Sequence, residues 1–211
     1  MKKVLIIMCL FLVTGCSKIN DLSYDDIINN IATRKANGNA YRTGYSYYLP
    51  KGMQVVESSL YNETIKNAKN KYYLYVDMVS YYKKIKKEYS KNSNAFISKT
   101  LEFDNKFGYV EVNLLQNDKY LVEIMYNYAK IEVIVDEKAI KEAMLSIINI
   151  LKSVEYNDSV IANLMGEDVL NFSEVEFNIF NTKGSESNYI TIDDDENSEE
   201  VTKIPDPDLI N

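Results

Sequence analysis

Hydrophobic and polar residues alternate through the middle of the chain, and a period of two residues predicts β-strands. The clearest stretch spans residues 107–135 and is interrupted at Asn117-Asp118. Because Asn and Asp tolerate positive φ angles, this dipeptide predicts the turn of a hairpin. The polar face of the hairpin is expected to carry Glu111, Asn113, Glu123 and Asn127, and its apolar face Val110, Val112, Leu114, Tyr120, Val122, Ile124 and Tyr126.

The chain before this hairpin contains further strand candidates. The first ends at Pro50-Lys51-Gly52, because proline interrupts strand pairing and glycine favours a turn. A basic, polar segment at 83–94 is expected to be a connection, either helical or disordered. The predicted strands span residues 41–49, 55–61, 72–79 and 96–103.

The hydrophobic period changes at Asp136, which is expected to cap a helix at about 137–152. Its apolar residues recur at spacings of three and four, so they share one face. An antiparallel sheet with one polar side needs a cover on its other side. We therefore predict an α+β fold with this helix packed on the sheet. The apolar residues of the helix are Ile140, Ala143, Met144, Ile147, Ile148 and Leu151.

Two shorter helices and a last hairpin complete the predicted domain. Ser23 followed by Asp26 is typical of a helix N-terminus. The apolar face of that helix, Ile27, Ile28 and Ile31, is expected to pack on the domain rather than on a partner or a membrane. The additional predicted elements are helices at 24–35 and 158–166 and a hairpin of 174–180 with 188–192.

The N-terminus has the three parts of a secretory signal. Lys2 and Lys3 precede a short apolar segment at 4–13, and small residues then lead to Cys16. As a helix the apolar segment would be about 15 Å long, half of a bilayer core of roughly 30 Å, so it is too short to span a membrane.

Val13-Thr14-Gly15-Cys16 resembles the lipobox of bacterial lipoproteins. The resemblance implies cleavage between Gly15 and Cys16 and lipidation of Cys16, with fatty acids such as palmitate, at the extracytoplasmic face of the cell membrane. The alternative is an ordinary secretory signal in which Cys16 is incidental. Because Cys9 lies in the removed segment, the lipidated chain would have no free thiol for a disulfide or for catalysis.

Composition excludes several kinds of chemistry. The chain contains no histidine, which excludes Ser-His-Asp catalysis, Cys-His catalysis and histidine-ligated zinc. The net charge is −7, and no basic stripe is present, so a nucleic-acid partner is not expected. We predict no catalytic residue, no metal site and no cofactor.

Acidic residues gather at the C-terminus. Asp193, Asp195 and Asn197 have the spacing of a calcium loop, but Ser198 and Ile204 stand where that loop needs glycine and glutamate. We therefore interpret this run as a solvated, disordered tail. The predicted organisation is a signal at 1–15, a tether at 16–23, a single α+β domain at 24–192 and the tail at 193–211.

The chain has eighteen tyrosines. Tyrosine suits both binding surfaces and half-buried strands, and we favour sheet packing for most of them. The exception is a candidate binding surface, which we expect at Tyr72, Tyr73 and Tyr75. Two of the three carboxylates Glu111, Glu123 and Glu132 would serve a glycosidase-like hydrolase if they met about 5 to 9 Å apart in a cleft.

The segment from Tyr45 to Met53, with its Pro50-Lys51-Gly52 turn, precedes several strands and a helix ending at Ser153. This arrangement resembles the Mog1/PsbP-like group over residues 41–156. The resemblance implies an antiparallel sheet with helices packed on it and a binding or accessory role. It transfers no catalytic residues.

These observations predict a non-enzymatic, lipid-anchored protein of the cell envelope that binds a protein or cell-wall partner. One alternative is a carrier that encloses a lipid or another small ligand, and a deep apolar cavity would favour it. A second is a carboxylate-based hydrolase of envelope polymers, favoured by paired acids with shifted pKa values in a cleft. A flat, exposed tyrosine-rich patch would favour partner binding.

Overall fold

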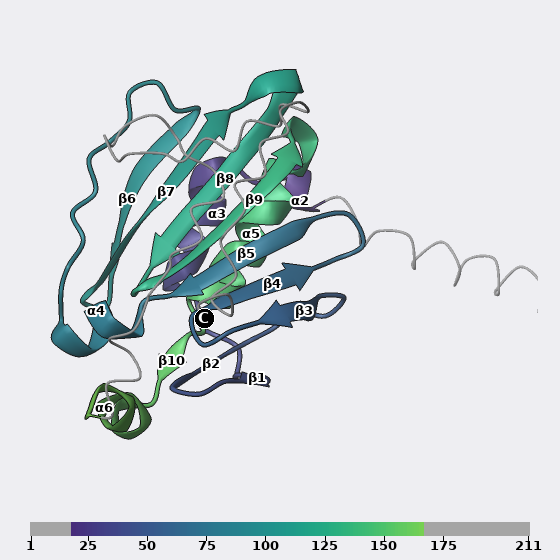
Figure 1. Ribbon diagram of the computed structural model, residues 1–211. Coiled ribbons are helices and arrows are strands. Elements are labelled where there is room, and N and C mark those ends of the chain that lie inside the picture. Colours follow the sequence, from purple (N-terminus) through teal and green to yellow (C-terminus); the bar gives the residue numbers. More distant parts are fainter. Residues whose placement is uncertain (1–17, 167–211) are drawn as a thin grey trace, which may run out of the picture. The chain divides into compact units, whose positions relative to one another are not determined.

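The computed structural model describes residues 18–166. Within this range, seven strands form one antiparallel sheet, three short strands form a second, and helices pack against them (Figure 1). The predicted α+β class and antiparallel sheet are confirmed. The signal segment, Cys16, the last hairpin and the acidic tail lie outside the described residues.

The large sheet has the strand order β3-β4-β5-β9-β8-β7-β6, and every neighbouring pair is antiparallel. Strands β3 to β5 form one meander and β6 to β9 another, and the two join where β5 pairs with β9 (Figure 1). The strands are β3 (Gln54–Ser58), β4 (Asn62–Lys66), β5 (Lys71–Val76), β6 (Ile97–Phe103), β7 (Lys106–Leu114), β8 (Lys119–Tyr126) and β9 (Ala129–Asp136).

The predicted hairpin is formed by β7 and β8. Asn117 and Asp118 have φ angles of 58° and 54°, which confirms the turn at this dipeptide. The loop is longer than two residues, because β7 ends at Leu114 and Leu115 N–H donates to the carbonyl of Lys119 at 2.7 Å. The hairpins β6–β7 and β8–β9 also turn through residues with positive φ, Asp104-Asn105 and Asn127-Tyr128.

Helix α5 (Ile140–Leu151) covers the apolar face of the sheet against β8 and β9, as predicted. A 3₁₀ turn, η3 (Glu137–Ala139), precedes it. The predicted cap at Asp136 is wrong, since this carboxylate makes no cap hydrogen bond. Asp136 instead accepts a hydrogen bond at 2.7 Å from Lys119, its partner across β8 and β9.

The predicted tether at 16–23 is partly helical. Helix α2 (Lys18–Asp21) contacts α5. Helix α3 (Tyr24–Asn29) follows with the expected cap, in which the Ser23 hydroxyl accepts a hydrogen bond from Asp26 N–H at 3.1 Å. Together with the 3₁₀ turn η1 (Asn30–Ala32), α3 packs on α5, which confirms the expected packing of its apolar face. The helix is shorter than predicted because Thr33 is extended.

The small sheet corrects the predicted strand at 41–49. It has the order β1-β2-β10, formed by β1 (Ala40–Tyr41), β2 (Tyr45–Tyr47) and β10 (Glu155–Tyr156). The chain reverses between β1 and β2 at Gly44, whose φ is +93°. A Cβ atom there would lie 2.7 Å from the Met78 sulfur, so only glycine fits this turn without displacing a core side chain.

The predicted strand at 72–79 also ends early. β5 stops at Val76, and Asp77 caps the short helix α4 (Met78–Lys83) by accepting a hydrogen bond from Ser80 N–H at 2.7 Å. Helix α6 (Asp158–Gly166) confirms the helix predicted there, although only Ile161 of its apolar residues is fully buried. Between residues 18 and 166, no helix is both long and apolar enough to span a membrane.

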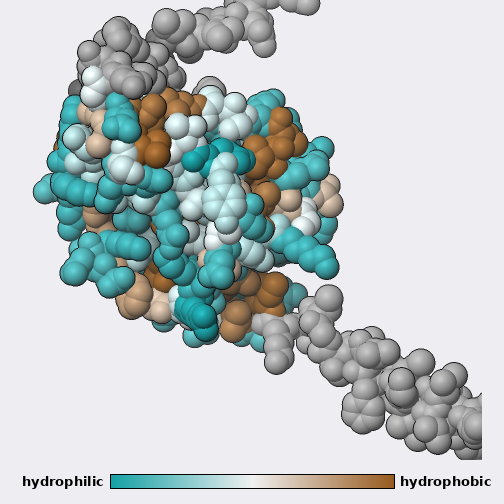
Figure 2. Space-filling view, turned by 90° about the horizontal axis from the view of Figure 1, so that it is seen from below, coloured by the Kyte–Doolittle hydropathy of each residue, from teal (hydrophilic) through white to brown (hydrophobic). Residues whose placement is uncertain are grey.

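Residues 18–166 belong to one compact unit. Figure 2 views the molecule from the lower end of Figure 1, at which α4, α6 and β1 lie. On this end, hydrophobic side chains form separate small patches between hydrophilic ones. An extended apolar surface is therefore not visible from this direction.

Candidate functional site

Three glutamates stand in one row across the sheet, on the face opposite α5. Strand register pairs Glu111 of β7 with Glu123 of β8, and Glu123 with Glu132 of β9. The sequence placed each of them on a polar face, and the pairing of β7, β8 and β9 brings them together. Like charges directly opposite one another destabilise a sheet, so each carboxylate needs a compensating partner.

Glu111 and Glu123 each accept a hydrogen bond from a tyrosine hydroxyl. Glu111 accepts from the Tyr89 hydroxyl and from Asn92 Nδ2 at 3.0 Å. Burial acts to raise the pKa of Glu111, but the hydrogen bonds from Tyr89, Asn113 and Asn92 together outweigh it and hold this pKa below its usual value. Glu123 accepts from the Tyr109 hydroxyl at 2.6 Å.

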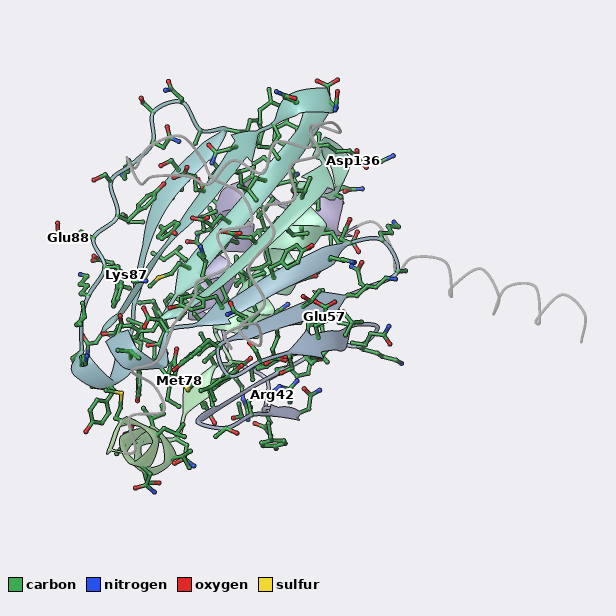
Figure 3. All side chains as sticks on the ribbon, viewed as in Figure 1. Arg42, Glu57, Met78, Lys87, Glu88 and Asp136 are labelled. Carbon is green, nitrogen blue, oxygen red and sulfur yellow. The ribbon has the colours of Figure 1, made fainter. Side chains whose placement is uncertain are left out.

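The connection between α4 and β6 supplies Tyr89 and covers this part of the sheet. The Tyr89 ring stacks on Tyr109 with ring centroids 4.2 Å apart. Earlier in the same connection, Lys87 forms an ion pair with Asp77 at 3.0 Å. Glu88, which stands between Lys87 and Tyr89 in the chain, points away from the sheet (Figure 3).

The third carboxylate, Glu132, is the most buried member of the row, with a side chain that is 1% exposed. One of its oxygens accepts from Lys130 Nζ at 2.9 Å, and the other has no hydrogen-bond partner. Lys130 Nζ also lies 4.0 Å from Glu123. Two carboxyl groups thus surround one ammonium group.

Burial is the main reason why the pKa of Glu132 rises to about 7, and the neighbouring Glu123 raises it further. Lys130 opposes this shift. A proton on Glu132 leaves one carboxylate and one ammonium, so the buried group becomes neutral overall. Neutralisation is the usual response of a buried charge that lacks full compensation.

The geometry does not match that of a glycosidase. Glu123 and Glu132 stand directly opposite each other in the register of β8 and β9 and share Lys130 Nζ, which lies 4.0 Å from Glu123 and 2.9 Å from Glu132, whereas a catalytic pair flanks a substrate in a cleft. The cavity beside Lys130 has a volume of about 40 Å³, close to that of one or two water molecules. Among the residues that the structure describes, no three acidic or sulfur side chains are placed to hold a metal ion.

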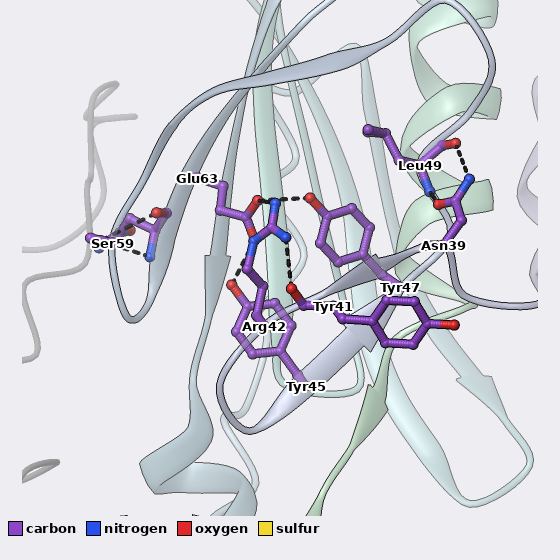
Figure 4. Close-up of polar contacts among 9 residues, drawn as sticks. Asn39, Tyr41, Arg42, Tyr45, Tyr47, Leu49, Ser59 and Glu63 are labelled. Atoms are coloured by element: carbon purple, nitrogen blue, oxygen red, sulfur yellow. Dashed lines mark hydrogen bonds and ion pairs between the residues drawn. The ribbon is translucent and has the colours of Figure 1, made fainter.

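A second buried carboxylate, Glu63 of β4, joins the two sheets (Figure 4). It accepts hydrogen bonds from the hydroxyls of Tyr45 and Tyr47 in β2, both at 2.8 Å, and from Arg42 at 2.6 Å. Burial, followed by the charge of Glu63, raises the pKa values of both tyrosines far above the usual value, so both hydroxyls remain donors. This cluster is an inter-sheet connection whose polar groups already bind one another.

Sequence reasoning missed Glu63, Arg42 and Lys130. The polar run Asn62-Glu63-Thr64 concealed β4, since a strand buried on one side normally shows an apolar residue at every second position. The partners of Glu63 lie 16 to 21 residues away in the chain. No local pattern marks such a contact.

The tyrosines named as a binding surface do not form one. Tyr72 is fully buried on the α5 side of β5, whereas Tyr73 lies on the other face. Tyr75 follows Tyr73 on that face and is also buried. The physical reason is the period of two in a strand, which sends neighbouring side chains to opposite faces. The predicted lipidation and cleavage residues, Cys16 and Gly15, lie outside the described residues.

Several cavities larger than the one beside Lys130 open onto the surface of the described residues. The largest, about 690 Å³, lies at the end of the domain where α2 meets the start of α5. One of about 460 Å³ lies at the turn between β6 and β7, another of about 330 Å³ is lined by several basic residues next to η1, and one of about 260 Å³ lies beside Glu63. The cavity beside Glu63 has a mostly apolar wall, but it is open to solvent rather than enclosed.

Comparison with protein-family models finds no match, and comparison with curated proteins finds none either.

Proposed function

We propose that this chain is a lipid-anchored protein of the extracytoplasmic face of the cell membrane, and that its α+β domain is a non-enzymatic binding module for an envelope protein or cell-wall partner. The observation that carries the proposal is the segment Val13-Thr14-Gly15-Cys16, which follows two lysines and a short apolar stretch. A diacylglyceryl group on Cys16 suffices for stable membrane attachment.

The arrangement of the acidic residues supports a binding role over hydrolysis. Glu111 and Glu123 accept hydrogen bonds from tyrosines, and Glu63 is enclosed by Arg42 and two hydroxyls. Carboxylates with these partners stabilise the sheet, whereas a general acid must reach a substrate in a cleft. Among the described residues, the raised pKa of Glu132 favours a hydrolase, but the cavity beside its partner Lys130 is too small for a sugar ring.

We assign partner binding to the end of the domain formed by α4 and the first residues after it. Tyr82 and Ile85 are exposed there, and Lys83, Lys84 and Lys86 surround them in the sequence. Exposed aromatic and apolar side chains next to positive charge are typical of interfaces with acidic partners.

The anchor is tested by substitution of the lipidated residue. In cells that express Cys16→Ala, the protein should leave the membrane fraction, whereas Cys9→Ala should behave as the unchanged chain because Cys9 lies in the removed segment. Fractionation followed by immunoblotting measures both variants. Equal membrane retention of Cys16→Ala would contradict the anchor.

The binding surface is tested by site-specific photocrosslinking in intact cells. A crosslinking residue at position 82 or 85 should give a discrete adduct that disappears when Lys83 and Lys86 are changed to Glu. The same residue at position 56, where Val56 is exposed on β3, is the matched control. Adducts of equal yield at positions 56 and 82 would argue against the assigned surface.

A further inference from the structure

The end of the domain that carries α2 adjoins Cys16 in the sequence. Helix α2 begins at Lys18, so Ser17 alone separates it from Cys16. Two residues of extended chain reach at most about 7 Å. α2 itself is held by the domain, because Lys141 of α5 donates a hydrogen bond to the carbonyl oxygen of Asn20 at 2.9 Å. An anchor on Cys16 would therefore draw this end of the domain onto the bilayer surface.

Apolar side chains are exposed at this same end. Ile19 in α2 and Leu22 directly after it are each 37% exposed, Phe96 just before β6 is 48% exposed, and Leu114 at the end of β7 is 60% exposed. Water contact of large apolar groups is unfavourable by about 25 cal/mol for each Å². Burial of these four side chains in a bilayer interface would remove that cost.

Aromatic contacts and strand pairing connect Phe96 and Leu114 with Tyr24 and Tyr120, and Ile19 and Leu22 lie just before Tyr24 in the chain. The Phe96 ring lies 5.7 Å from Tyr24, which follows α2, and 5.4 Å from Tyr120. Tyr120 is the cross-strand partner of Leu114. Tyr24 and Tyr120 are half-buried, and tyrosine is favoured at the boundary between apolar and aqueous regions. We call Ile19, Leu22, Phe96 and Leu114, with Tyr24 and Tyr120, the basal surface.

Charges around the basal surface are largely compensated. Lys99 pairs with Asp25, and Lys119 pairs with Asp136. Lys141 lies over the Tyr24 ring, 5.5 Å from its centroid. Because basic and acidic groups alternate here, attraction to anionic lipid supplies little of the contact. The chemistry fits the headgroup and upper acyl region of a zwitterionic bilayer.

We propose that the basal surface rests in the membrane interface and fixes the orientation of the domain, with α4 and β1 directed away from the bilayer. This inference rests on the proposed lipid anchor at Cys16. It adds a second, non-covalent contact and names the residues that make it.

Site-specific labelling through an added cysteine tests this orientation. In the proposed mature form the Cys16 thiol is alkylated, so an added cysteine is the one site for a nitroxide label. Leu22→Cys and Leu114→Cys report on the basal surface, and Tyr41→Cys is the matched control, since Tyr41 is 73% exposed in β1. Arg42, next to it, lies at the end of the domain opposite Asp136 (Figure 3). Each full-length lipidated variant is placed in phosphatidylcholine vesicles.

Power-saturation measurements should show labels at 22 and 114 to be more accessible to oxygen and less accessible to a water-soluble nickel chelate than the label at 41. Added salt should leave this difference unchanged, because screening acts on charge and not on apolar contact. Equal exposure of all three labels to the chelate, with Cys16 lipidated by mass spectrometry, would overturn the basal surface and leave the anchor intact. An unmodified Cys16 would overturn both.

Discussion

Two buried glutamates balance their charge in different ways. Glu63 is surrounded by an arginine and two tyrosine hydroxyls, so its carboxylate is fully compensated. Glu132 shares Lys130 with Glu123, and burial raises its pKa to about 7. The first arrangement connects two sheets, whereas the second makes the sheet sensitive to pH.

Replacing Glu63 with Ala should destabilise the domain by about 3–5 kcal/mol, because removal of one member of a buried ion pair leaves the other uncompensated. Glu102→Ala is the control, since the Glu102 side chain is 75% exposed and its ion pair with Lys86 is long, at 3.8 Å. Its expected cost is below about 1 kcal/mol. Urea unfolding followed by circular dichroism measures both values. Similar losses for the two variants would show that the inter-sheet cluster contributes little.

The raised pKa of Glu132 predicts a loss of stability with increasing pH. Between its usual value of 4.5 and about 7, the folded protein holds a proton that the unfolded chain has released. The free energy of unfolding therefore falls across this interval and stays lower above it. Glu132→Gln removes the titration, so the variant should gain stability relative to the unchanged protein as pH rises from 4 to 8.

Thermal unfolding across this pH range measures the difference between the two proteins. Glu102→Gln is the matched control, and its difference from the unchanged protein should vary little with pH. A constant difference for Glu132→Gln as well would mean that the pKa of Glu132 is the same in the folded and the unfolded chain, and would contradict the raised pKa.

At the scale of elements, the strength of the hydrophobic period decided what the sequence could predict. The β7–β8 hairpin and α5 have long, regular patterns, and both are confirmed. β1, β2 and β10 have two or three residues each, too few for a period to be visible. β4 is concealed because its core-facing side includes Glu63, whose partners come from another sheet.

The candidate site was predictable only in part for the same reason. Polar positions at Glu111, Glu123 and Glu132 follow from alternation within each strand. Their meeting depends on the register between strands, which pairs all three directly, and alternation alone does not fix that register. Lys130 precedes Glu132 by two residues on the same face, but nothing local marks it as the counter-charge for both carboxyls.

Gly108 tests the β7–β8 register directly. A Cβ atom at this position would lie 2.0 Å from the backbone oxygen of Met125, and a backbone clash cannot be relieved by a side-chain rotation. We expect Gly108→Ala to destabilise the domain by about 1–3 kcal/mol or more.

The control is Gly166→Ala, because no described atom outside its own helical turn lies within 4 Å of a Cβ built there. Chemical denaturation of both variants provides the comparison. A Gly108→Ala protein as stable as the Gly166→Ala protein would contradict the close approach of the two strands.

At the scale of the whole molecule, the proposed anchor and the domain are closely connected. Helix α2 occupies residues 18–21 of the expected tether and is hydrogen-bonded to α5 through Asn20 and Lys141. A lipid on Cys16 would thus position the domain as well as retain it at the membrane. The surface with Tyr82 and Ile85 would then be available to partners in the envelope.

The central claim is the lipid at Cys16, and intact-mass spectrometry of the protein extracted from membranes tests it most directly. The account predicts a chain that begins at Cys16, carries the added mass of a diacylglyceryl group, and gives an N-terminal fragment in which Cys16 bears that mass. A membrane-derived chain with an unmodified Cys16, or one that begins at another residue, would contradict it.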